Sequence, residues 1–186
     1  MKFKNIKTLV PILTRPEPCG MNKYYPKTER VKAHPGQLFK YANVEIEMLY
    51  SLEFNAPNVL EFYNNSSLVN KVFVHGQSIM MTGDMGPEAN PICRKYYGNY
   101  LKSDFYQVAH HGGQGGSNEF NKLCNPKYVL WPVGERSYQS LKDHSYNSWL
   151  STSGTVDIFF PAWYHTTVIN LPFDGKESSY EVYPNK

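Results

Sequence analysis

Two short stretches of the sequence each end an apolar run on residues that can bind metal ions or move protons. In MMTGDMG, residues 80–86, the run ends at Asp84, and in YQVAHHGGQGG, residues 106–116, it ends at His110 and His111. Zinc, manganese and iron accept both an aspartate oxygen and an imidazole nitrogen as ligands. The glycines beside these residues allow sharp turns and a close approach to a ligand. The two stretches therefore indicate one shared metal or catalytic site.

Each of these motifs also has a structural interpretation. A TGD sequence at a strand end can be a turn closed by an aspartate hydrogen bond, and a His-His pair before glycines can be a surface loop. Asp143, followed by His144, is interpreted as the N-cap of a helix. The remaining histidines are weaker candidates for chemistry, and His75 fits the turn of a hairpin; they are His34, His75 and His165.

Residue periodicity predicts the elements that position Asp84 and His110. Alternating or continuous apolar runs predict strands at 43–52, 66–74, 78–84, 104–110, 127–133, 155–161 and 165–172. Helices are expected from Pro87 to about Tyr100, from a Ser117 cap to Leu123, and over 144–152. A hairpin-rich start followed by helices predicts an α+β fold. Asp84 and His110 are 110 − 84 = 26 positions apart, one strand–helix–strand unit, so their strand ends meet if the two strands are neighbours.

Composition limits the class of protein. The chain has 186 residues, of which 41% are hydrophobic, which is enough for one domain with a core. A net charge of +3 is too small to argue by itself for nucleic-acid binding. Three widely spaced cysteines indicate free thiols in a reducing compartment, so a cytoplasmic protein is expected. No apolar run reaches the roughly 20 residues of a membrane span, and the start does not fit a signal peptide.

Several segments, taken in order, resemble the metallo-β-lactamase superfamily. The matching segments are 64–85, with the words VFVHGQSIMMTGDM, and 104–135, with DFYQVAHHGG and KYVLWPVGE; 143–150 and 156–171 match more weakly. Residues 34–51 resemble the preceding strand pair. The most similar branch is the hydrolase domain at the end of ComEC-type DNA-uptake proteins, together with its stand-alone relatives. Order, spacing and short words agree together, which makes the resemblance more specific than TGD or HHG alone.

The resemblance implies an αββα sandwich with a centre of zinc or manganese ions. In that pattern Asp84 bridges two metals and His110 binds one of them. His111 is either the alternative ligand or a neighbour that lines the site. His144, before a late helix, is expected to support the ligands from outside or to face the substrate.

The sequence departs from this family in one large respect. The main ligand motif, HxHxDH, is absent, because no two of the six histidines are separated by one residue. That motif belongs to the first half of the fold, so the chain resembles the second half alone. Residues 1–35 are expected to form an arm or linker, and 36–186 a half-domain. Since Asp84 and His110 supply two ligands where a catalytic zinc has three, zinc or manganese is expected to bind weakly or not at all.

Three functions follow from these observations. The first is a metal-dependent hydrolase of an ester or phosphodiester, incomplete in this chain. The second is a non-catalytic half-domain that self-associates, or binds a missing N-terminal half, through an apolar sheet face. The third is nucleic-acid binding, suggested by the DNA-uptake relatives; no membrane partner is expected. The inner sheet face is expected to carry Val44, Ile46, Met48, Leu68, Val72, Ile79, Met81, Tyr106, Val108 and Leu130.

Overall fold

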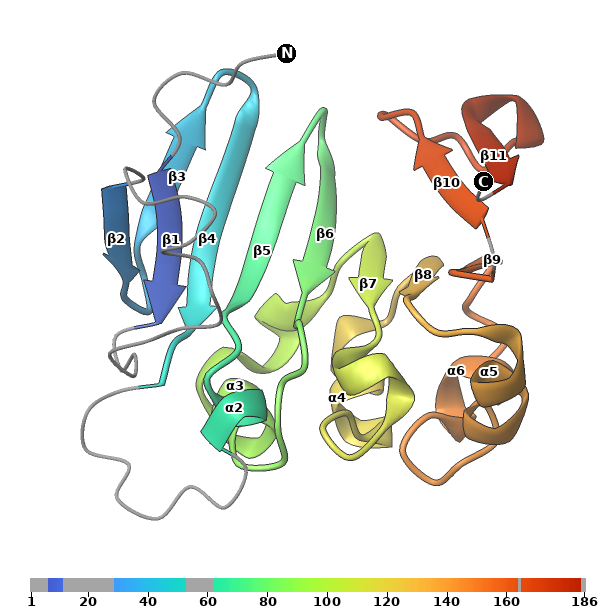
Figure 1. Cartoon of the computed structure of the whole chain (residues 1–186), viewed down its shortest axis with the longest axis horizontal. Coiled ribbons are helices and arrows are strands. Elements are labelled where there is room, and N and C mark those ends of the chain that lie inside the picture. The colour runs from blue at the N-terminus through green and yellow to red at the C-terminus, as the bar shows by residue number, and fades with distance from the viewer. Residues whose placement is uncertain (1–6, 12–28, 53–61, 164, 185–186) are drawn as a thin grey trace.

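A computed structural model describes residues 7–11, 29–52, 62–163 and 165–184. Its main element is a seven-stranded sheet in which the strands follow chain order (Figure 1). The strands are β3 (Leu38–Tyr41), β4 (Val44–Tyr50), β5 (Val69–Val74), β6 (Gln77–Met81), β7 (Phe105–Gln107), β8 (Tyr128–Trp131) and β9 (Ile158–Pro161). The α+β class, with one sheet and flanking helices, is as the sequence predicts.

The sheet changes character at β6. Strands β3 to β6 pair antiparallel, with short turns joining β3 to β4 and β5 to β6, whereas β6 to β9 pair parallel. Parallel neighbours need crossover connections, and helices supply them. The helices are α2 (Phe62–Asn65), α3 (Ala89–Tyr97), α4 (Asn118–Cys124), α5 (Glu135–Leu141) and α6 (Ser148–Thr152), with short 3-10 turns η1 (Gly98–Leu101), η2 (Ala109–Gly112) and η3 (Glu177–Ser179).

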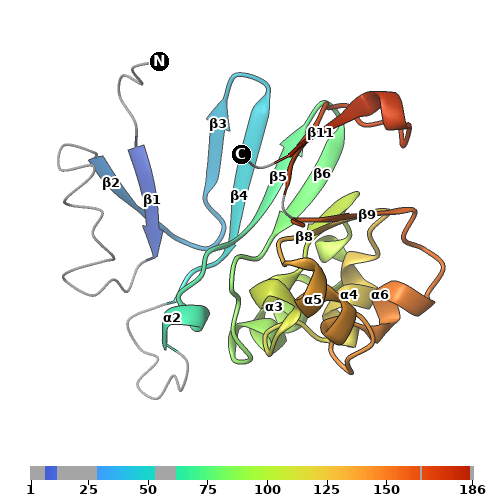
Figure 2. The ribbon, with the colours of Figure 1, turned by 45° about the vertical axis from the view of Figure 1, so that its right-hand side comes forward.

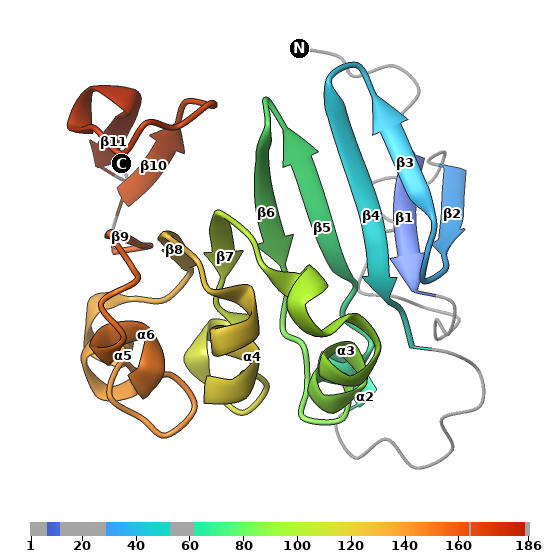
Figure 3. The same ribbon diagram turned by 180° about the vertical axis from the view of Figure 1, so that it is seen from behind.

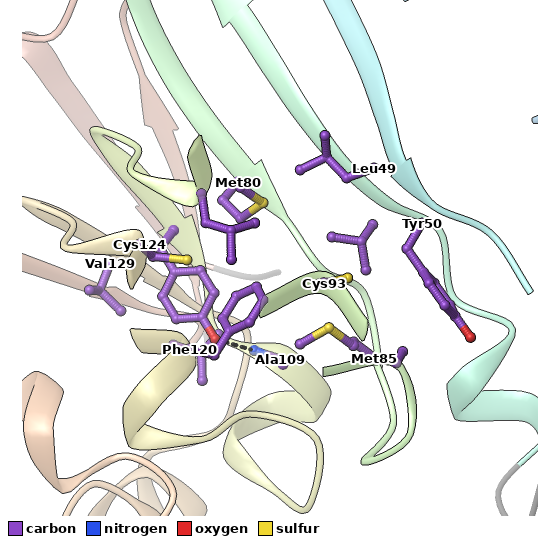
Figure 4. Packing of buried hydrophobic residues seen from close by; sticks show 14 of the residues in the cluster. Leu49, Tyr50, Met80, Met85, Cys93, Ala109, Phe120, Cys124 and Val129 are labelled. Atoms are coloured by element: carbon purple, nitrogen blue, oxygen red, sulfur yellow. Dashed lines mark hydrogen bonds between the residues drawn. The ribbon is translucent and has the colours of Figure 1, made fainter. Parts of the chain in front are cut away.

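Helices α3 to α6 gather along one side of the parallel half of the sheet (Figures 1 and 2). The core lies between them and the strands, and Figure 4 shows Met80, Cys93, Phe120 and Cys124 packed within it. Tyr106 is completely buried in this cluster. Cys93 is fully buried there and is a core residue.

The described residues cover the opposite sheet face only in part. A hairpin of β10 (His165–Ile169) and β11 (Tyr180–Pro184) stands apart from the main sheet, as Figure 3 shows from behind. Near it, Phe173 packs on Phe105, Tyr128 and Phe160. Over β4 and β5 the same face carries apolar side chains that remain partly exposed: Val44, Ile46, Val72 and Val74.

Strand register corrects two residues of the expected sheet face. Tyr106 pairs with Met80 and Val129 and belongs to the helix-side core, and Val108 lies in the same core. The expectation that these two share a face with Ile46 and Ile79 is therefore wrong. Pairing places Ile46 beside Val72 and Val72 beside Ile79, so that part of the expected face is confirmed.

The expected helix over 144–152 is shorter in the structure, where α6 forms only its second half, and the sequence did not predict α5. α5 ends at Leu141 and α6 begins at Ser148, with Asn147 at its N-cap position. Asp143 is therefore not an N-cap, because it lies in the loop between the two helices. In contrast, Ser117 caps α4 as predicted, since its side chain accepts the N–H of Phe120 at 3.1 Å.

The first 35 residues include a small separate sheet. β1 (Lys7–Pro11) and β2 (Glu29–Ala33) pair parallel to each other and are not hydrogen-bonded to the main sheet. The other residues expected to form the arm, 1–6 and 12–28, lie outside the described part. Among the described helices, none has the length and apolar character needed to cross a membrane.

Candidate metal centre

The two strand ends that carry Asp84 and His110 lie side by side. Strands β6 and β7 are parallel neighbours, with Ile79 paired to Phe105 and Met80 to Tyr106. Both pairs have the separation of the two site residues, since 105 − 79 = 26 and 110 − 84 = 26. Beyond the strands this alignment continues, because the His110 N–H donates to the carbonyl of Gly83 at 3.0 Å. The loops after β6 and β7 therefore form one surface.

Gln107 holds the TGD turn in place. Its Oε1 accepts the N–H groups of Thr82 and Gly83 at 3.0 and 2.7 Å, and its Nε2 donates to the carbonyls of Gly83 and Val108. The Thr82 hydroxyl donates back to the Gln107 carbonyl at 2.7 Å. Because one side chain satisfies so many polar groups of the turn, the backbone that leads into Asp84 is fixed by β7.

The His-His-Gly loop needs its glycines. His110 and His111 both have left-handed backbone angles, with φ of 47° and 55°, which is uncommon for residues other than glycine. A Cβ on Gly112 would lie 2.8 Å from the Trp131 ring, and one on Gly115 would lie 1.9 Å from the Met85 carbonyl oxygen. The second loop therefore packs backbone against backbone on the residue that follows Asp84.

Buried asparagines tie this loop to the helices. Asn90 in α3 donates to the carbonyl of Gly115 at 2.8 Å. Asn147 donates to the carbonyls of Gly112 and Leu141 at 2.8 and 3.0 Å. Both side chains are almost fully buried. Buried hydrogen bonds of this kind stabilise the loop, which is rich in glycine and has few side chains that can pack.

Asp84 and His111 form the central pair of the site. His111 Nε2 lies 3.2 Å from Asp84 Oδ1, and both side chains are about half exposed. The other ring nitrogen, Nδ1, lies 2.6 Å from the carbonyl oxygen of Pro132. That oxygen can only accept, so Nδ1 carries a proton and Nε2 is the atom turned toward the carboxylate. Nε2 and Oδ1 are thus two electron-pair donors that face each other, the arrangement in which both can bind one cation.

The pair fits part of a metal site. A histidine whose Nδ1–H is held by a backbone carbonyl presents Nε2 in the usual manner of a metal ligand. With bonds of about 2.0–2.2 Å, two ligands of a tetrahedral zinc ion stand about 3.3 Å apart, close to the observed Nε2–Oδ1 separation. However, the described residues contain no group of three or more His, Cys, Asp or Glu that could hold a metal ion. Within this part of the chain the ligand set is thus a pair.

The other candidate residues lie around this pair. His110 Nδ1 is 3.2 Å from the carbonyl oxygen of Gln114, and its side chain is partly buried. His144 is exposed, stacks on Tyr146 with ring centroids 4.4 Å apart, and has its Nδ1 3.4 Å from Ser145 Oγ. No contact joins His144 to Asp84, His110 or His111 within the described structure.

Sequence reasoning missed the residues that position the pair. Gln107 sits in an apolar strand where a lone polar residue is a recognisable signal, because a buried amide needs partners. Pro132 acts through its backbone carbonyl, which leaves no mark in the sequence. Asn147 was expected inside a helix, and its bond to Gly112 depends on the loop between α5 and α6.

No family model matches the sequence, and no curated protein matches it significantly. Among solved structures, the chain is similar to the diiron β-hydroxylase CmlA of Streptomyces venezuelae, with TM-score 0.44 and 13% identity. It is also similar to a Thermotoga maritima protein assigned to the zinc-dependent hydrolases of the metallo-β-lactamase superfamily, with TM-score 0.35 and 14% identity. No family membership follows from similarities this low.

The coverage of these two similarities is also partial. They include 67% and 57% of this chain, and only 30% and 51% of the other two chains. The chain therefore spans about a third of the first protein and about half of the second. The metals and reactions named for those proteins are properties of those proteins.

Proposed function

We propose that this chain supplies part of the metal centre of a metal-dependent hydrolase that acts on an ester or phosphodiester. The observation that carries this proposal is the Asp84–His111 pair, with Nε2 facing Oδ1 at 3.2 Å and Nδ1 held by Pro132. The resemblance of the TGD and HHG segments to metallo-β-lactamases supports it. The finer resemblance to ComEC-type domains is part of the same proposal, as is the choice of zinc or manganese.

Asp84 and His111 would hold the ion, with His110 as the additional candidate ligand from the same loop. A divalent cation there supplies Lewis-acid chemistry, polarising the carbonyl or phosphoryl oxygen of a substrate. The residues of this chain orient the ligands: Pro132 fixes the His111 ring and Gln107 fixes the turn before Asp84. A catalytic zinc has three protein ligands, so the remaining ligands come from residues outside the described pair.

Titration calorimetry with Zn²⁺ and Mn²⁺ tests this proposal. The wild-type chain is expected to bind weakly, and Asp84→Asn and His111→Gln are each expected to reduce the affinity at least about tenfold, as loss of one ligand from a small set does. His144→Gln is the matched control, because this exposed histidine does not contact the pair. Wild-type affinity in both Asp84→Asn and His111→Gln would exclude this site.

Hydrolysis itself is measured with bis(p-nitrophenyl) phosphate and p-nitrophenyl acetate. The isolated chain is expected to show no turnover, because the described residues supply only a pair of ligands. Turnover with added Mn²⁺ that Asp84→Asn abolishes would show instead that the chain holds a complete centre. Turnover that persists in Asp84→Asn would place the chemistry elsewhere.

A second candidate function is a non-catalytic half-domain that self-associates. The partly exposed apolar face over β4 and β5 favours it, because contiguous apolar surface on a soluble domain marks an interaction site. This candidate predicts the same weak metal binding but no turnover with any added partner chain. The two candidates therefore differ in whether a complementary chain restores hydrolysis.

A further inference from the structure

A cleft of about 290 Å³ opens between β10 and the C-terminal ends of β7, β8 and β9. Its walls include Leu130, Trp131, Phe160 and Ile169, and its polar side chains include His165 and Thr167. The β10 side chains that face it alternate with exposed ones, so a single strand covers this end of the sheet. Because β10 is paired only with β11, the cleft lies between the main sheet and the separate hairpin.

The cleft adjoins the loops of the Asp84–His111 pair through two of its lining residues. Pro132 lines the cleft, and its carbonyl oxygen accepts the Nδ1–H of His111 at 2.6 Å. Gln107 also lines the cleft, and its Oε1 accepts the N–H of Gly83, the residue before Asp84. Pro132 and Gln107 therefore stand between the cleft and the carboxylate–imidazole pair.

The lining indicates what kind of group the cleft binds. The amide of Gln107 is occupied within the TGD turn, so its hydrogen bonds are not available to a ligand. No described residue hydrogen-bonds the His165 ring or the Thr167 hydroxyl, which leaves both free for a ligand. Ligand pockets typically combine apolar walls with a few such polar groups. An apolar cavity of about 150 Å³ holds benzene, so this cleft suits a group the size of one substituted ring.

We propose that the cleft binds the aryl end of an aryl ester or aryl phosphodiester, with the scissile group at the Asp84–His111 pair. The cleavage step of this inference rests on the proposed function. The binding of the ring rests on the cleft alone. Phe160 contributes an aromatic wall, and aromatic rings pack on each other edge-to-face or offset. His165 and Thr167 contribute hydrogen bonds to a polar substituent of the ring. His165 thereby becomes a specificity residue for the substrate.

The test titrates the isotope-labelled chain with phenyl phosphate or methyl phosphate in the presence of EDTA. Two-dimensional NMR of the chain detects the binding. Phenyl phosphate is expected to shift the amides of residues 130–131 and 165–169 and to bind at least about tenfold more tightly than methyl phosphate, since only the ring buries apolar area. Thr167→Trp, which fills the cleft, is expected to abolish this preference. Val168→Trp is the matched control, because Val168 is the next residue of β10 and its side chain is exposed.

Three outcomes would overturn the inference: equal affinity for the two probes, a preference that survives Thr167→Trp, or octyl phosphate binding in the cleft more tightly than phenyl phosphate. Thermal unfolding of both tryptophan variants verifies that they fold. Thr167→Ala is a milder variant, which is expected to keep the fold and to weaken the preference for phenyl phosphate without abolishing it. The proposed function is tested separately by metal titration. Metal binding at Asp84 with no ring preference contradicts this inference alone, whereas ring preference without metal binding contradicts the proposed function alone.

Discussion

Gly115 lies so close to Met85 that a Cβ on it would stand 1.9 Å from the Met85 carbonyl oxygen. The loop that carries His111 and the loop that carries Asp84 are thus in direct backbone contact. Gly115→Ala is expected to push them apart and to lower the free energy of unfolding by about 1–3 kcal/mol, the cost of overpacking. The urea midpoint measures the loss, and Zn²⁺ affinity is expected to fall with it.

Gly134→Ala is the control for that variant, because a Cβ at Gly134 meets no atom within 4 Å and its backbone φ is −71°. Its urea midpoint is expected to fall much less than that of Gly115→Ala, because only the N-cap preference of α5 for glycine over alanine is lost. If Gly115→Ala retains both the wild-type midpoint and the wild-type metal affinity, the close packing of the two loops is not a feature of the protein in solution.

Gln107 provides a test of the turn that precedes Asp84. Gln107→Leu keeps the side-chain size but leaves the N–H groups of Thr82 and Gly83 without an acceptor. Each buried unsatisfied donor costs about 1–3 kcal/mol, so a clear loss of stability is expected. Gln139→Leu, at an exposed position of α5, is expected to change stability little. Chemical denaturation of the two variants side by side decides whether the Gln107 network is formed.

The buried cysteines give a prediction about thiol reactivity. Burial raises the pKa of Cys93 to about 12 and that of Cys124 well above its usual value. The reactive species is the thiolate, so at pH 8 neither thiol is expected to react with Ellman's reagent in the folded chain. At most one of the three thiols, Cys19, should be labelled before unfolding and all three afterwards. Fast labelling of Cys93 at pH 8 would contradict the packing of α3.

The same thiols make stability depend on pH. An exposed thiol has a pKa of about 8.5, whereas burial raises the pKa of Cys93 in the folded chain to about 12. A raised pKa in the folded state gives stability that is fully present below the unfolded pKa and is lost as the pH rises through the folded pKa. The free energy of unfolding is therefore expected to fall as the pH rises above about 8.5. Cys93→Ala should reduce this slope, as urea midpoints across that pH range will show.

Self-association is expected through the apolar face over β4 and β5. Leaving several apolar side chains partly in water is costly, at about 25 cal/mol per Å² of apolar surface. Ile46→Lys places a charge on this face and is expected to shift the chain toward monomer in sedimentation experiments. Glu45→Lys, on the opposite face of the same strand, is the matched control. A wild-type chain that remains monomeric at micromolar concentration would show that other residues of this chain cover the face.

Much of the main sheet could be predicted from the sequence because its strands have simple patterns. Residues 43–52 alternate in polarity, and β4 occupies Val44–Tyr50. The separation of 26 between Asp84 and His110 matches the β6–β7 register, so the meeting of those strand ends followed from spacing. In contrast, α5 has no buried residue and turns only Tyr138 and Leu141 toward the core, a pattern too short for periodicity to reveal.

The sequence could not reveal which histidine contacts Asp84. Consecutive residues of an extended chain point in opposite directions, but His110 and His111 both lie in the left-handed region. This turn brings His111 to Asp84 and leaves Nδ1 of His110 near Gln114. The conformation depends on Gly112 and Gly115 fitting against Trp131 and Met85, which is tertiary information. The resemblance to a family could assign His110 as a metal ligand only because it is the first histidine of the HHG motif.

The switch of the sheet from antiparallel to parallel at β6 has a consequence for the order of folding. The β5–β6 hairpin pairs residues 3 to 11 positions apart, whereas β6 meets β7 across 26 positions, after the crossover through α3 closes. Local pairings form faster than distant ones, so early folding species carry Asp84 without His111 beside it. An ion held by both residues stabilises a contact that the early species lack. Such an ion slows the unfolding rate of the chain and leaves its folding rate nearly unchanged.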